Sequence, residues 1–190
     1  MRKFSFEKNE YLQGVYLISP LLAEDERGYV IKDYHEELFK QEGIDLNLRE
    51  VFYTKSKKGV IRAIHFQTVK PQAKLVRCVS GRIYDVIVDL RVDSPTFKKW
   101  QAFELFEGGP ELYVPYGFGH GYLVLEDSIV SYKCDEKFYG EYDSGIIWND
   151  EEINVEWPID NIGSIILSEK DKNLQTLKEY MEKEDAFKML

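Results

Sequence analysis

The sequence predicts a mainly β protein, a jelly roll or a related double sheet with short helices at its periphery. The middle of the chain is a series of short segments rich in Val, Ile, Tyr and Phe, the residue types that favour strands. Turn residues separate these segments at Lys58-Gly59, Ser80-Gly81, Asp93-Ser94-Pro95, Gly108-Gly109-Pro110 and Tyr116-Gly117. No internal repeat or Pro/Gly/Ser-rich linker interrupts the chain. We therefore expect one domain over 1–190, with a core of about 12–172 and a C-terminal helical extension of about 173–190.

The segment from Arg82 to Arg91 shows the clearest strand pattern. Alternation places the side chains at 84, 86, 88 and 90 on one face and those at 83, 85, 87 and 89 on the other. Both faces carry apolar residues, as in a sandwich or barrel whose strands are covered on both sides.

Two other predicted strands carry polar residues with chemical potential. In 61–67, alternation puts one set of side chains on the face of His65 (Ile61, Ala63 and Gln67) and the other on the face of Arg62 (Ile64 and Phe66). In 128–134, Tyr132 alternates with Val130 and Cys134.

Helical patterning is confined to the edges of the predicted sheets. One helix is expected from Glu36 to Gly43, and a second from Asn173 to Leu190, where Leu174, Leu177 and Met181 recur at spacings of three and four. The preceding run Ser168-Glu169-Lys170-Asp171 has the outline of an N-terminal helix cap.

The charge of the chain is unevenly distributed. The net charge of −9 argues against nucleic acid or an anionic membrane as the main partner. The stretch from Lys55 to Arg82 nevertheless contains eight basic residues and no acidic one. It is interpreted either as a solvated basic face or as a local anion site, sized for a phosphorylated small molecule.

Neither a membrane span nor an export signal is expected. The chain has no run of about 18 apolar residues, and its first residues lack the apolar stretch of a secretory signal. These features predict a cytoplasmic protein, in which Cys78 and Cys134 stay reduced as small core residues.

Three histidines limit the choice of a general base. His35 lies at a polar helix start and is interpreted as a surface residue without a role. His65 is flanked on its face by small or polar side chains, so it is either a hydrogen-bonded core histidine or a general base. His120 ends the turn Pro115-Tyr116-Gly117-Phe118-Gly119-His120.

That Pro-x-Gly-x-x-His turn is similar to the second motif of the cupin superfamily of jelly rolls, in whose metal-binding members the histidine is a ligand. The first cupin motif would fall at His65-Phe66-Gln67, where one of the paired histidines is missing. Because a metal site needs three or four protein ligands, we expect no metal here.

A longer series of motifs resembles the dTDP-4-dehydrorhamnose 3,5-epimerase family. The matches occur in order from Asp25-Glu26-Arg27-Gly28 to Asp171, over roughly three-quarters of the chain. They include Arg62-x-x-His65-Phe66-Gln67, Lys74-Leu75-Val76-Arg77, Gly81-x-x-x-Asp85-Val86-x-Val88-Asp89-x-Arg91, Ser94-Pro95-Thr96-Phe97, Tyr132-Lys133-Cys134, Trp148-Asn149-Asp150, Trp157-Pro158 and Leu167-Ser168-x-Lys170-Asp171.

The resemblance implies an epimerase of a nucleoside-diphosphate 4-keto-6-deoxyhexose, in rhamnose or related deoxysugar synthesis, that needs no metal or other cofactor. His65 would be the base, Asp171 the carboxylate that orients it, Tyr132 the acid on the far face, and Lys74 the cation for the enolate oxygen. The residues alone favour Asp171 as part of a helix cap, Tyr132 as a core aromatic and Lys74 as an exposed lysine.

The resemblance also implies a substrate-binding set. Arg27 and Arg62 would hold the diphosphate, with Gln67, His120 and Tyr139 in the sugar site. Family members are homodimers, so the resemblance implies a homodimer here as well. In the family arrangement an N-terminal strand is exchanged between subunits, and Arg27 would reach the neighbouring site.

This chain departs from the family pattern in its substrate set more than in its catalytic set. Lys32 replaces a usual Glu, Glu50-Val51-Phe52 replaces Gln-x-Asn, and Ala63 replaces a common Gly. A different nucleotide or sugar, or epimerisation at carbon 3 or 5 alone, therefore stays open. So do a non-catalytic cupin that binds a sugar nucleotide and a metal-dependent cupin oxygenase or isomerase.

Overall fold

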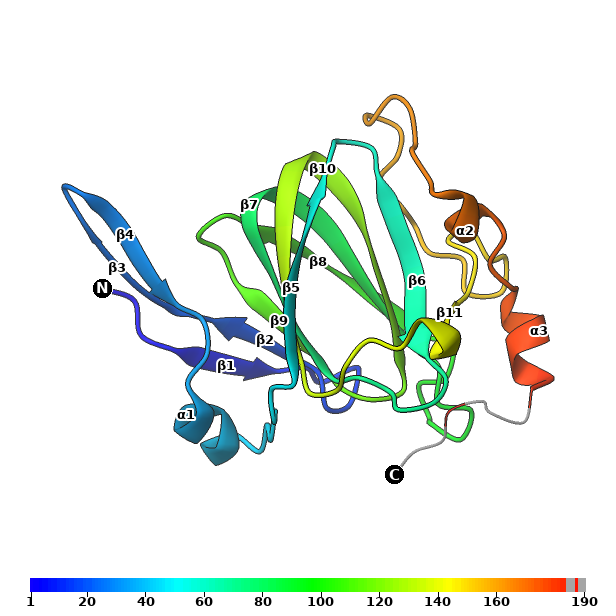
Figure 1. The fold of residues 1–190 in the computed structure, drawn as a ribbon, viewed down its shortest axis with the longest axis horizontal. Coiled ribbons are helices and arrows are strands. Elements are labelled where there is room, and N and C mark those ends of the chain that lie inside the picture. Colours follow the sequence, from blue (N-terminus) through cyan, green and yellow to red (C-terminus); the bar gives the residue numbers. More distant parts are fainter. Residues whose placement is uncertain (184–186, 188–190) are drawn as a thin grey trace.

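The computed structural model describes residues 1–183 and 187 and confirms the mainly β fold (Figure 1). Its elements, in chain order, are β1 (Ser5–Lys8), β2 (Tyr16–Ser19), β3 (Leu21–Asp25), β4 (Gly28–Lys32), α1 (Glu36–Gln41), β5 (Glu50–Ser56), β6 (Ile61–Gln67), β7 (Lys74–Asp89), β8 (Trp100–Phe106), β9 (Glu111–Val114), β10 (Phe118–Cys134), η1 (Gly140–Tyr142), β11 (Asp143–Gly145), α2 (Glu169–Lys172) and α3 (Leu177–Met181). None of these helices is long and apolar enough to cross a membrane.

Two long antiparallel strands, β7 and β10, are shared by the two halves of the sheet. They pair along their whole length, from Phe118 opposite Asp89 to Cys134 opposite Lys74. One half continues from this pair to β8, β6 and β11, and the other to β5, β9, β2 and β1. The shared ribbon therefore produces the double sheet that the turn spacing predicted.

The bend in this ribbon depends on a glycine. Gly81 has a φ of +80°, and a Cβ at this position would lie 2.2 Å from the Asp127 carbonyl oxygen. Register shifts in β10 between Val124 and Val130 lie opposite the same bend. Only glycine fits both the positive φ and this close backbone approach.

Apolar clusters lie on both faces of the ribbon, as the alternation in 82–91 predicts. Ile83 and Ile87 pack in the cluster between the half-sheets, whereas Val86 and Val88 pack on the other face, against residues of the C-terminal segment. Both cysteines are buried and free.

The predicted helix over 36–43 is confirmed as α1, but the continuous helix over 173–190 is wrong within the described residues. The chain instead forms α2 and α3, with Gln175 between them bridged to Ile146 and accepting a hydrogen bond from the Ile147 amide. Because this backbone pairs with another segment, it is extended rather than helical. The rest of the predicted helix, 184–186 and 188–190, lies outside the described residues.

Candidate active site

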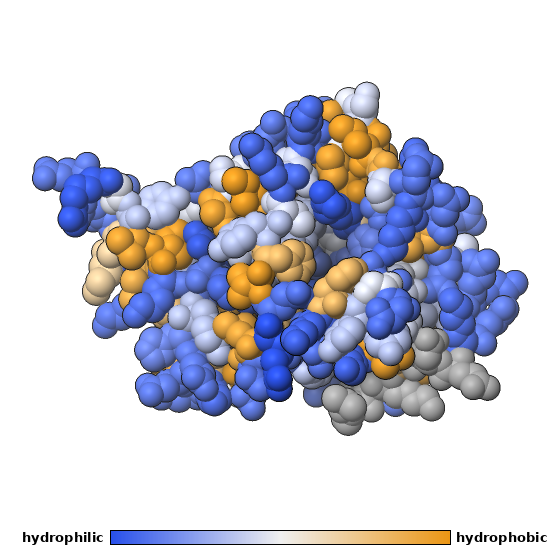
Figure 2. All heavy atoms as spheres, in the orientation of Figure 1, coloured by the Kyte–Doolittle hydropathy of each residue, from blue (hydrophilic) through white to orange (hydrophobic). Residues whose placement is uncertain are grey.

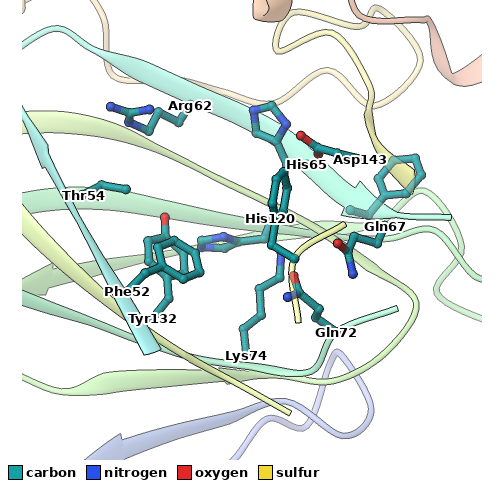
Figure 3. Close-up of a pocket in the computed structure, with 12 residues that line it drawn as sticks. Phe52, Thr54, Arg62, His65, Gln67, Gln72, Lys74, His120, Tyr132 and Asp143 are labelled. Carbon is teal, nitrogen blue, oxygen red and sulfur yellow. The ribbon is translucent and has the colours of Figure 1, made fainter. Parts of the chain in front are cut away.

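A pocket of about 230 Å³ opens between the half-sheets, and most of the predicted site residues line it (Figure 3). Its walls come from β5, β6, β7, β10 and β11. The predicted residues that the structure brings together here are Arg62, His65, Gln67, Lys74, His120 and Tyr132. Among the described residues, no group of three or more His, Cys, Asp or Glu side chains is placed to hold a metal ion.

A β-bulge in the β6–β10 pair places Arg62 and His65 in the same pocket. His120 lies opposite His65 and Tyr122 lies opposite Arg62, so two residues of β6 face one residue of β10 between these positions. Such a bulge changes the face of the strand to which the following side chains point. The expectation that Arg62 and His65 occupy opposite faces of the strand is therefore wrong.

His65 is paired with Asp171. Its Nε2 lies 2.8 Å from Asp171 Oδ1; the His65 side chain is 26% exposed and that of Asp171 is 6% exposed. Burial raises the pKa of Asp171, but the interactions with His65 and Ser168 outweigh this and hold the pKa below its ordinary value. With Nε2 directed to the carboxylate, Nδ1 is the nitrogen of His65 left for a ligand.

Asp171 belongs to a helix cap as well as to the pair with His65. Its backbone amide donates to Ser168 Oγ at 3.0 Å at the start of α2, and its carboxylate reaches His65. The segment before α2 is fixed to β6 because Ile61 N donates to Ile166 O. Asp171 is therefore both part of the helix cap and the partner of His65, and the cap fixes the backbone that carries its carboxylate.

His120 belongs to a second pair, with Asp85, a residue that was not among the predicted site residues. The His120 Nε2 lies 3.0 and 2.9 Å from the two Asp85 carboxylate oxygens, and both side chains are buried. Burial raises the pKa of Asp85, and His120 and then Lys74 oppose that shift. The signal available was an aspartate between Ile83 and Ile87 on an apolar strand face, which needs a partner.

Tyr132 is buried at the back of the pocket. Its ring stacks on that of Phe52, with centroids 4.6 Å apart and planes at 10°, and meets the edge of His120 at 5.8 Å. Burial raises the pKa of Tyr132 well above its ordinary value, and Tyr122 and Asp85 raise it further. The hydroxyl therefore stays protonated at neutral pH, as an acid requires.

Lys74 is the cation on the floor of the pocket (Figure 3). Burial lowers the pKa of its ammonium, while the nearby Cys134, Asp143 and Asp85 oppose this shift. Within the described part of the chain, no carboxylate forms an ion pair with it. It is therefore not the exposed lysine that the residues alone suggested, and its charge is available to a ligand.

Arg62 lies at the side of the pocket with its terminal nitrogens available. Its Nε donates to Ser56 Oγ at 3.1 Å, and in residues 1–183 and 187 no carboxylate pairs with the guanidinium. Other basic residues of 55–82 have partners elsewhere: Arg77 pairs with Asp33 and Arg82 with Glu126. Some basic residues of 55–82 therefore contribute positive charge to the pocket, whereas others belong to an ordinary charged surface.

The Gln67 amide holds the loops at the pocket mouth. Its Nε2 donates to the carbonyls of Lys70 and Lys137 at 2.8 and 3.1 Å, and its Oε1 accepts from the Tyr139 amide at 2.6 Å. Tyr139 lies beside the mouth rather than in the lining, and its hydroxyl accepts from Lys70 Nζ at 3.2 Å. Most of the hydrogen-bonding capacity of Gln67 is therefore used by backbone groups.

Arg27 lies away from the pocket of its own chain. It is at the tip of the β3–β4 hairpin, which extends from the body of the protein in Figure 1. Its side chain is 84% exposed and pairs with Asp25 at 2.6 Å. The structure therefore does not bring Arg27 together with the other predicted residues.

The family model for dTDP-4-dehydrorhamnose 3,5-epimerase matches residues 9–179. The chain belongs to this family. A dTDP-4-dehydrorhamnose 3,5-epimerase of Methanothermobacter thermautotrophicus is 42% identical over 94% of this chain and 97% of that protein. The family places the protein among the isomerases.

Solved structures of the family share the fold. An epimerase of Legionella pneumophila in complex with dTDP-4-keto-L-rhamnose has a TM-score of 0.93 at 27% identity and covers 99% of this chain and 100% of its own. ChmJ, a 3'-monoepimerase of Streptomyces bikiniensis in complex with dTDP-quinovose, has a TM-score of 0.88 at 28% identity and covers 96% and 92%. The predicted cupin-type jelly roll is thereby confirmed.

Proposed function

We propose that the protein converts dTDP-4-dehydro-6-deoxyglucose to dTDP-4-dehydrorhamnose by inverting carbons 3 and 5, in rhamnose biosynthesis. The observation that carries this proposal is the His65–Asp171 pair, which opens onto a pocket that also holds Tyr132 and Lys74. The ketone at carbon 4 acidifies the protons on both neighbouring carbons. The reaction then needs a base, an acid on the other face and a positive charge for the oxygen.

His65 takes the proton. Its Nδ1 accepts it from the carbon next to the ketone, and the C–H electron pair moves into an enolate. Asp171, 2.8 Å from Nε2, holds the tautomer and stabilises the imidazolium that forms. The partial exposure of His65 also lets its proton exchange with solvent.

Lys74 and Tyr132 complete the step. The Lys74 ammonium stabilises the enolate oxygen, because it is a cation in an enclosed site without an ion pair within the described chain. The Tyr132 hydroxyl then donates its proton to carbon, and the ketone re-forms. The acid comes from β10 and the base from β6, on different walls of the pocket in Figure 3, which supports delivery to the opposite face.

Arg62 binds the diphosphate, since a guanidinium grips phosphate oxygens with paired hydrogen bonds. His120 forms the buried side of the sugar site, and Gln67 acts by holding the mouth loops that include Tyr139.

The reaction is tested by incubating the purified protein with dTDP-4-dehydro-6-deoxyglucose in deuterated water and counting deuterons in the recovered sugar by mass spectrometry. Two deuterons are expected. One restricts the enzyme to a single carbon, as in the monoepimerase ChmJ, and would replace the proposed product. Binding without any deuteron favours a non-catalytic sugar-nucleotide module and overturns the proposed reaction.

The second part of the proposal is a homodimer in which Arg27 serves the partner's site. The hairpin that carries Arg27 extends from the body of the protein, and it and β5 expose large apolar side chains, namely Tyr29, Val30, Val51 and Tyr53. Figure 2 shows apolar residues at the base of this hairpin, among several apolar patches on a mostly hydrophilic face. Exposed apolar groups of this kind mark interaction surfaces.

Mixing two defective variants tests this arrangement. His65→Ala lacks the base and Arg27→Ala lacks the diphosphate contact. A mixed dimer contains one site with both groups intact if Arg27 acts across the interface, so mixing restores activity at low substrate concentration. A monomer in gel filtration, or no restoration after subunit exchange, contradicts the dimeric site.

A further inference from the structure

Phe52 is an aromatic residue of the pocket at a position where the family pattern has Asn. Phe52 and Tyr132 are direct cross-strand partners on β5 and β10. Their rings are stacked at 4.6 Å with an interplanar angle of 10°. Phe52 is 37% exposed and lines the pocket, whereas Tyr132 is only 7% exposed. Phe52 therefore separates the Tyr132 ring from the open side of the pocket.

A second ring contact of Tyr132 is with His120. The His120 ring meets it edge-on, with centroids 5.8 Å apart and planes at 77°. His120 is itself fixed by Asp85, at 2.9 Å, and both of these side chains are buried. Tyr132 thus lies between the buried His120 imidazole and the Phe52 ring, and Phe52 is the contact that lies nearer solvent.

We propose that Phe52 is a positioning residue for reprotonation: its ring fixes the direction of the Tyr132 hydroxyl, so that Tyr132 delivers its proton to the face opposite His65. This inference rests on the function proposed above. In the step concerned, the Tyr132 O–H bond breaks, the enolate electron pair forms the new C–H bond, and the carbonyl at carbon 4 re-forms. A small misplacement of the hydroxyl slows this step by about a hundredfold without affecting the base.

Loss of the Phe52 ring is expected to separate two rates: that of deuterium exchange with retention of configuration and that of inversion. His65 removes the substrate proton and can return a solvent deuteron to the same face, which gives exchange without inversion. Tyr132 gives exchange with inversion. Because Phe52 contacts Tyr132 and has no ring contact with His65 in the described structure, its loss lowers inversion and spares exchange with retention.

The experiment compares Phe52→Ala, Phe52→Tyr and the wild type in deuterated water, with inverted and retained sugars resolved by NMR. Phe52→Ala lowers inversion by about ten- to a hundredfold, while deuterium entry with retention stays within about threefold. Phe52→Tyr keeps the stacked ring and restores the wild-type ratio. Phe138→Ala is the matched control, since Phe138 lines the same pocket without a ring contact to Tyr132; it changes KM and leaves the ratio unchanged.

Equal losses of exchange and inversion in Phe52→Ala, or an unchanged ratio, overturn the positioning role. Phe52→Leu provides a second variant if the alanine protein is poorly folded, because it retains side-chain volume but not the stack. A wild type that neither exchanges nor inverts instead overturns the proposed function, and this is established before any variant is compared.

Discussion

The two histidine–aspartate pairs of the pocket are alike in chemistry and different in setting. The His65–Asp171 pair is open, with a quarter of the histidine side chain exposed, whereas His120 and Asp85 are sealed in the sheet. The pKa of Asp171 is below its ordinary value, and that of Asp85 is raised by burial. The open pair can therefore meet a ligand and carry a charge that forms during turnover, while the sealed pair supplies a fixed wall.

The pairs also differ in how the chain builds them. Asp85 and His120 come from neighbouring positions of the β7–β10 ladder, where Tyr122 lies opposite Asp85 and His120 opposite Ile87. Asp171 comes from α2, far along the chain from His65 on β6. The sheet alone fixes the sealed pair, and docking of the C-terminal segment completes the open one.

Removing the open histidine has the largest expected effect. His65→Ala lowers turnover by about a thousandfold or more, because the base is lost. Initial rates of product formation measure this, and His35→Ala, which removes a histidine outside the pocket, is the control with wild-type rates. Full activity of His65→Ala would show that the open pair does not supply the base, and the functional distinction between the two pairs would be lost.

Asp171→Asn sharpens the comparison by separating the dyad from the helix cap. The backbone amide that Ser168 caps is retained, but the carboxylate that stabilises the imidazolium is lost, so kcat falls by about a hundredfold or more, with little change in stability. Ser168→Ala is the reciprocal variant and lowers the free energy of unfolding by about 1 kcal/mol. If Asp171→Asn turns over normally, the Asp171 carboxylate has no part in catalysis and Asp171 acts only through its capped amide.

Lys74 interacts with Asp85 of the sealed pair. Its lowered pKa is expected to set the alkaline limb of the pH profile of kcat/KM. Burial lowers the Lys74 pKa, so the ammonium loses its proton below the ordinary value of 10.5 as pH rises. Because only the charged form stabilises the enolate, kcat/KM falls on that side. Lys74→Arg stays charged and moves the limb to higher pH, whereas the same limb in both proteins excludes Lys74 as its source.

Glu111 extends the comparison to a buried carboxylate without a histidine and has the smallest expected effect. Neither of its oxygens has a hydrogen-bond partner in the described structure, and burial raises its pKa well above the ordinary value. The unfolded chain then releases this proton at lower pH than the folded one, so stability falls as pH rises from the unfolded pKa towards the folded one.

Glu111→Gln removes that loss and raises the free energy of unfolding on the order of 1 kcal/mol at pH 8, with turnover unchanged. Urea unfolding at pH 5 and pH 8 measures the difference. A variant less stable than the wild type at pH 8 would contradict this prediction, because it would show that neighbouring groups compensate the charge of Glu111.

The parts of the fold that depend on local periodicity were predictable from the sequence. The alternation in β7 and the face of Tyr132 on β10 follow from strand geometry. The shared pocket of Arg62 and His65 depends on a bulge, which alternation cannot show. The extended chain around Gln175 depends on pairing with Ile146, so helical spacing was misleading there. Asp85 could be identified as a polar residue on an apolar face and as part of a family motif, but neither signal shows its pairing with His120.

The most direct test of the account is the face of deuterium entry in Tyr132→Phe and His65→Ala, measured by NMR on sugar recovered from deuterated water. If His65 is the base and Tyr132 the acid, Tyr132→Phe exchanges the proton with retention and forms almost no inverted sugar, and His65→Ala does neither. Inverted sugar from Tyr132→Phe at the wild-type rate, or deuterium entry in His65→Ala at the wild-type rate, contradicts the assignment.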